Sequence, residues 1–129
     1  MARRVEYIPE PEPLPGELET PKLKRRLLKS LRVMLDFYGL ALQGRIDRKP
    51  VVAKACNYAE RRANWQDVPK PGYINHNLLR LTRIIEALNV LGVSKVAQAL
   101  ALALAEIQKD VPEKIPARTV AFWNQAAGL

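Results

Sequence analysis

The side chains that carry most enzyme chemistry are scarce in this sequence. It contains one histidine, His76, and one cysteine, Cys56, in segments that we expect to form different elements. A thiol nucleophile needs a histidine base within hydrogen-bonding distance, and nothing in the spacing brings these two residues together. The sequence also lacks a Cys/His cluster at metal-site spacing, a glycine-rich phosphate loop and paired carboxylates in an apolar segment. We therefore predict a protein that is not an enzyme and that binds neither a metal nor a cofactor.

Clustered cations are the most distinctive chemical feature of the chain. The formal net charge is +8 at pH 7, and residues 20–62 carry most of it. Concentrated positive charge attracts polyanions, of which nucleic acid is the commonest. The alternative is a solvated surface without a ligand. If the charge binds nucleic acid, the expected phosphate contacts are Lys22, Arg25, Arg26, Lys29, Arg32, Arg45, Arg48, Lys49, Arg61 and Arg62.

The spacing of apolar residues predicts an all-α fold, a compact bundle of about five helices. No strand pattern of useful length is visible. Residues 40–49 are expected to be a connector with a short extended piece at 40–42 and a turn at Gly44. The expected helices run from Pro21 to Tyr38, from a cap at Asp47 to Arg62, from Asn75 to Leu91, from Lys95 to Lys109 and from Pro116 to Ala127.

The third of these helices is apolar on two sides, which is typical of a helix buried between neighbours. Asn75 is its expected cap, so His76 lies in its first turn. His76 either forms a structural hydrogen bond that ties the loop of residues 64–73 to the helix, or contacts a ligand or phosphate at the helix N-terminus. Trp65, in the same loop, is expected to fold onto the core.

Residues 1–19 form the expected N-terminal arm, and residues 20–129 a single helical domain. Alternating prolines in the arm forbid a helix and favour an extended chain, which is either disordered or lies along another protein subunit. No apolar run reaches the roughly 18 residues of a membrane span, and the first residues lack the apolar core of a signal peptide. We therefore expect an intracellular protein that does not bind membranes, cytoplasmic or, in a eukaryote, nuclear.

Five short segments resemble the conserved N-terminal domain of the opioid growth factor receptor family (OGFr-like domain), over roughly residues 27 to 127. They are Leu35–Leu40, Asn57–Tyr58, Asn64–Trp65, His76–Ile84 and Leu91–Gly92. The chain departs from the family in a longer insertion at Asp67–Tyr73 and in its N-terminal arm. The residues that carry the resemblance, each with a structural or a ligand-binding role, are Phe37, Tyr38, Gly39, Asn57, Tyr58, Trp65, His76, Asn77, Arg80, Thr82 and Arg83.

The resemblance implies a helical domain; the family is described as binding the opioid peptide Met-enkephalin and as regulating growth at the nucleus. We carry over the fold and the motif positions, and not the receptor role, because a stand-alone basic domain need not share it.

Two function hypotheses follow. The first is a non-catalytic module that binds the phosphate backbone of nucleic acid without sequence preference, as a small subunit of a nucleoprotein complex such as a CRISPR-type effector. The second is a protein- or peptide-interaction domain with its groove beside the third helix. In both, the arm of residues 1–19 contacts other protein subunits, and self-association is an open alternative.

Overall fold

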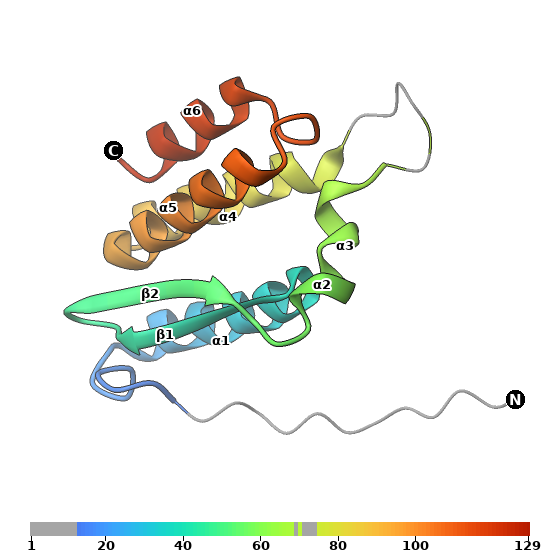
Figure 1. Ribbon diagram of the computed structural model, residues 1–129. Helices are drawn as coiled ribbons and strands as arrows, with labels where there is room; N and C mark the ends of the chain where they lie inside the picture. The colour runs from blue at the N-terminus through green and yellow to red at the C-terminus, as the bar shows by residue number, and fades with distance from the viewer. Residues whose placement is uncertain (1–12, 69, 71–74) are drawn as a thin grey trace, which may run out of the picture.

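The structure, a computed structural model, describes residues 13–68, 70 and 75–129. Four helices of ten residues or more, two single-turn helices and one β-hairpin make up this part of the chain (Figure 1). In order they are α1 (Lys22–Tyr38), β1 (Leu40–Arg45), β2 (Lys49–Lys54), α2 (Tyr58–Arg61), α3 (Ala63–Gln66), α4 (His76–Val90), α5 (Ser94–Asp110) and α6 (Ala117–Ala126).

Helix α1 confirms the first predicted helix. Leu28, Leu31, Leu35 and Tyr38 recur at helical spacing and are buried. Leu23, which continues the same stripe in the sequence, is 68% exposed because the first turn extends beyond the core. The cationic face of the helix points outward, so α1 is amphipathic in the ordinary sense, with one side in the core and the other in solvent.

Residues 40–54 form a β-hairpin, where the sequence predicted a connector and the start of a second helix. Strands β1 and β2 pair antiparallel, from Leu40 opposite Lys54 to Arg45 opposite Lys49. The β-branched Val51 and Val52 suit a strand, and Pro50 is tolerated in a strand that has a free edge. The helical prediction for residues 47–62 is therefore wrong except for the single turn α2. The fold is mostly helical rather than all-α.

Helices α4, α5 and α6 confirm the remaining three predicted helices within about a residue at each end. The Asn75 side chain accepts a hydrogen bond from the Asn77 backbone N–H at 3.1 Å and so caps α4 as expected. Leu81, Ile85 and Leu88 on α4 are fully buried, as are Leu100 and Leu104 on α5. Burial of each such side chain contributes about 1.5 to 3 kcal/mol.

The hairpin lies between two helical layers (Figure 1). Strand β1 packs on α1, and strand β2 packs on α5. Helix α5 in turn packs on α4, and α6 covers both of them. The two-stranded sheet is thus held on each side by a helix, which a hairpin of this size needs because it is marginally stable alone.

Residues 13–20 fold against the domain, and residues 1–12 of the predicted arm lie outside the described residues. The backbone N–H of Ile46, at the hairpin tip, donates to the carbonyl of Pro15 at 3.1 Å. Glu17 is 4% exposed and forms an ion pair with Arg32 of α1 at 2.8 Å. This segment therefore links the start of α1 to the hairpin tip.

The junction of α1 and β1 depends on Gly39. Its φ of +80° is left-handed, a conformation that costs side-chain-bearing residues energy. Its backbone also approaches α2, because a Cβ built at Gly39 would lie 2.8 Å from the Cα of Tyr58. The Gly39 carbonyl accepts a hydrogen bond from the Ala55 N–H at 2.8 Å. Gly39 therefore ends α1 and fixes where the returning strand ends.

We predict that Gly39→Ala lowers the free energy of unfolding by about 2 kcal/mol or more, since left-handed strain adds to the clash with Tyr58. Gly128→Ala is the matched control, because Gly128 has a φ of +77° but a Cβ there would make only ordinary contact with Asn89, at 3.5 Å or more. The control therefore measures the cost of the left-handed backbone conformation alone, which we expect to lower the free energy of unfolding by about 1 kcal/mol. Urea denaturation of both variants measures the difference, and equal losses would contradict the close approach.

Candidate functional site

Two adjoining hollows lie between β2 and α5. The larger, of about 520 Å³, is lined by residues 48–52 and by Lys95, Gln98, Ala99, Leu102, Ala103 and Glu106. The smaller, of about 330 Å³, is lined by Leu40, residues 52–54, Ala103, Glu106, Ile107, Lys109 and Asp110. Because both are lined by Val52, Ala103 and Glu106, they form one surface depression, which we name the β2–α5 groove.

Small side chains on α5 leave this groove open. Ala99 and Ala103 are one helical turn apart and partly buried, so they form its floor. Val51 of β2 is 44% exposed and Leu102 of α5 is 58% exposed, so apolar walls stand on both sides. The groove therefore offers apolar surface and unfilled space to another molecule.

The charges of the groove are not spread evenly. Glu106 is paired with Lys109 at 2.8 Å, and its hydrogen bond and negative charge raise the pKa of the Lys109 ammonium. Asp110 reaches across the groove to Lys54 of β2 at 3.7 Å. At the end of the groove beside the hairpin tip, three cations have no carboxylate partner among the described residues: Arg48, Lys49 and Lys95.

The hairpin tip is held in place by its own polar contacts. Arg45 pairs with Asp47 at 2.7 Å, and this hydrogen bond, with the charges of Arg45 and Arg48, holds the pKa of the Asp47 carboxyl below its usual value. The Lys95 ammonium donates to the Asp47 backbone carbonyl at 3.1 Å. This contact ties the first turn of α5 to the hairpin and keeps the basic end of the groove together.

The residues that carry the family resemblance form a structural junction instead. The Trp65 indole N–H donates to the Tyr38 carbonyl at 3.0 Å, and the Asn64 amide donates to the Phe37 carbonyl at 2.7 Å. The Asn77 amide donates to the Asn64 carbonyl at 2.7 Å. Burial raises the pKa of the Tyr38 phenol, which therefore keeps its proton and donates to Asn77. These bonds join the ends of α1, α3 and α4.

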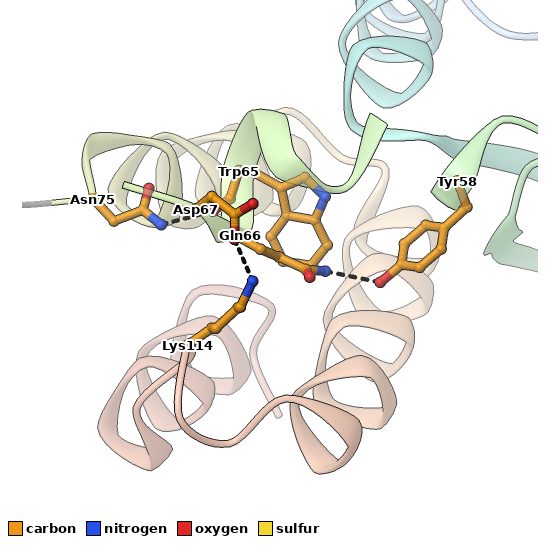
Figure 2. A network of polar contacts seen from close by, with 6 residues as sticks. All are labelled: Tyr58, Trp65, Gln66, Asp67, Asn75 and Lys114. Atoms are coloured by element: carbon orange, nitrogen blue, oxygen red, sulfur yellow. Dashed lines mark hydrogen bonds and ion pairs between the residues drawn. The ribbon is translucent and has the colours of Figure 1, made fainter. Parts of the chain in front are cut away.

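A second group of polar contacts surrounds α3 (Figure 2). The Asn75 amide donates to the Trp65 carbonyl at 2.7 Å, and the buried Gln66 amide donates to the Tyr58 hydroxyl at 2.8 Å. Asp67 pairs with Lys114, which precedes α6. Trp65 is fully buried, as predicted. Asn75 and Asn77 thus tie α3 to the start of α4, and no bond of this kind from His76 to a described residue is present.

The remaining motif residues lie at the edges of this junction. His76 and Arg83 are exposed, and Arg80 reaches back to Asn77 at 3.4 Å. Thr82 donates to the carbonyl of Leu78 on its own helix. Asn57 precedes α2. His76 forms no hydrogen bond with a described residue, so its predicted structural bond is not seen in this part of the chain.

The ten cations that the sequence suggested for phosphate binding are dispersed. Lys22, Arg25, Arg26 and Lys29 are exposed on α1, and Arg62 is exposed after α2. Arg32 is turned toward Glu17, Arg45 is paired with Asp47, and Arg61 packs beside Gly39. Only Arg48 and Lys49 of the ten line the β2–α5 groove, together with Lys95, which the sequence analysis did not single out.

The described part of the chain holds no group of three or more His, Cys, Asp or Glu side chains that could bind a metal ion. None of the described helices is long and apolar enough to cross a membrane.

We predict that Asn77→Ala lowers the free energy of unfolding by about 1 to 3 kcal/mol, because it leaves the Asn64 carbonyl and the Tyr38 hydroxyl unpaired. Asn124→Ala is the control, since the half-buried Asn124 side chain has no hydrogen bond within the described residues; it should change stability by less than about 0.5 kcal/mol. Thermal and urea unfolding compare the two. Equal losses would show that the junction does not depend on Asn77.

Comparison with known proteins identifies a family and several relatives that match this chain. Residues 16–116 match the opioid growth factor receptor (OGFr) conserved region. The human opioid growth factor receptor is 30% identical over 96 residues, which cover 70% of this chain and 13% of the receptor. Opioid growth factor receptor-like protein 1 is 36% identical in the rat, over 57% of this chain and 14% of that protein. The Xenopus tropicalis protein of that name is 28% identical over 84% of this chain and 18% of its own length.

No solved structure matches the chain significantly. The chain spans less than a fifth of the length of each of these relatives. The matched region contains α1, the hairpin, the junction around Trp65, α4 and α5. Since this match covers most of the chain, the protein belongs to the family defined by the opioid growth factor receptor conserved region.

Proposed function

We propose that this domain is a non-catalytic protein- or peptide-interaction module and that the β2–α5 groove is its binding surface. The main support for the proposal is the groove, because it combines an alanine floor, exposed apolar walls and exposed cations in one depression. Such a mixture of apolar surface with a few charged groups is typical of sites that bind another molecule. The family supports the same function, since its matched relatives are named a receptor and a receptor-like protein.

The position of the groove differs from the sequence hypothesis, which placed it beside the third predicted helix. That helix, α4, contributes to neither hollow, and its apolar residues Leu78, Leu81, Ile85 and Leu88 are buried in the core. Their burial supports a scaffold role for α4. The groove instead uses α5 and the hairpin strand that the sequence had assigned to a helix.

The comparisons lend no support to a nucleic-acid-binding subunit of a nucleoprotein complex, and the family favours the second hypothesis. Binding along a phosphate backbone needs many cations on one face. Within the described residues, the exposed cations are spread over α1, the hairpin and the helices that follow it, and Arg32 and Arg45 are ion-paired. We therefore develop the interaction function alone.

Filling the groove tests this function. Peptides are selected from a random displayed library on the immobilised full chain, synthesised, and measured by fluorescence anisotropy. We expect Ala103→Leu to weaken binding at least about tenfold, since about 1.4 kcal/mol of lost contact has that effect. The added side chain occupies space between β2 and α5, and leucine suits a helix.

The control is Ala121→Leu, the same change at an exposed position of α6 outside the groove, which should leave binding unchanged. Thermal unfolding of both variants verifies that each is folded. Peptides that bind Ala103→Leu as tightly as the unmodified chain, or a library that yields no binder, would contradict the proposal.

A further inference from the structure

The two ends of the β2–α5 groove differ in how their charges are satisfied. At one end the acids Glu106 and Asp110 are each already paired with a lysine. At the other end Arg48, Lys49 and Lys95 are exposed, and none of them forms an ion pair with a carboxylate of the described residues. The groove thus runs from a neutralised end to an end with three unbalanced positive charges.

The positive end is built and is not a chance gathering of flexible side chains. The Asp47 carboxylate is paired with Arg45 and also faces the charge of Arg48, so a single carboxylate serves several cations and the tip keeps a net positive charge. Lys95 is anchored to the hairpin through the Asp47 carbonyl. The hairpin tip itself is attached to the segment of residues 13–20, because the Ile46 N–H donates to the Pro15 carbonyl. Both elements that carry the cations are therefore fixed relative to each other.

We propose that the partner of this groove is an acidic peptide segment with bulky apolar side chains, an inference that rests on the proposed function. The apolar side chains would lie over Ala99 and Ala103, between Val51 and Leu102. The partner's carboxylates would meet Arg48, Lys49 and Lys95. Complementary charge at the rim of an apolar contact mainly sets partner choice and association rate, and apolar burial supplies most of the affinity.

A nucleic acid fits the same groove poorly. The lining of both hollows contains no aromatic side chain on which a base could stack. The carboxylates of Glu106 and Asp110 lie along the path that a phosphate backbone would follow. An acidic peptide avoids both difficulties, because its carboxylates need to occupy only one end while its apolar side chains cover the remainder.

A charge exchange tests the partner's chemistry. Two fluorescein-labelled synthetic peptides share a core of leucine and phenylalanine and carry a run of glutamates or of lysines at one end. We expect the glutamate peptide to bind the full chain about tenfold more tightly than the lysine peptide at low salt, with the difference shrinking as salt is added. Arg48→Glu with Lys49→Glu should reverse this preference.

Arg25→Glu with Arg26→Glu is the matched control, because it makes the same change of net charge on the exposed face of α1. It should leave the preference for glutamate intact. Ala103→Leu should weaken binding of the glutamate peptide, which shows that the peptide lies in the groove. A reversal by the hairpin variant with none by the α1 variant supports the proposal.

The remaining outcomes separate the two proposals. If library-selected peptides are weakened by Ala103→Leu but show no charge preference, the acidic partner is wrong and the interaction function stands. If neither the synthetic nor the library peptides bind, and a labelled single-stranded oligonucleotide binds in a way that Arg48→Glu with Lys49→Glu abolishes, the cations serve a nucleic acid and both proposals fail.

Discussion

The fold depends on the left-handed turn at Gly39. This residue ends α1 and is followed directly by β1, so the hairpin has no linker that could move it away from the helix. After the hairpin the chain comes back to Gly39, where the Ala55 N–H donates to the Gly39 carbonyl. The Tyr58 backbone lies so close to Gly39 there that it leaves no room for a Cβ atom. Because β1 is fixed on α1, β2 is placed against α5, and the groove follows from that contact.

The hydrogen bonds around Trp65 hold the same end of α1 through α3 and the start of α4. Backbone carbonyls at the ends of α1 and α3 accept hydrogen bonds from Asn64, Trp65, Asn75 and Asn77. Partly buried carbonyls without partners would cost about 1 to 3 kcal/mol each, so these side chains are needed for the turns to be packed inside. The motif that reveals the family thus joins three helix ends.

Sequence reasoning succeeded where one local periodicity decided the structure. Helices α1, α4 and α5 each bury an apolar stripe at helical spacing, α6 buries Trp123, and Gly39, Asn75 and Gly92 marked ends that the structure confirms. It failed at residues 47–54, where Val51, Val52 and Ala53 fit a helix or a strand equally well by pattern. Pairing with residues 40–45 across a three-residue turn decides between them, and the apolar pattern of residues 47–54 alone does not reveal that pairing. The groove was missed for the same reason, since its two walls are about 50 residues apart in the chain.

The residues of the family motif and the residues that line the groove lie in different parts of the fold. The motif residues stabilise the junction of α1, α3 and α4, whereas the groove is lined by the hairpin tip, β2 and one face of α5. A chain can therefore match the family through its scaffold and still carry any chemistry in its groove, because changes at Arg48, Lys49, Lys95, Ala99 or Ala103 would not touch the junction. Membership alone then indicates the scaffold. The chemistry of the proposed partner is indicated instead by the alanines that leave space and by the cations that form no ion pair.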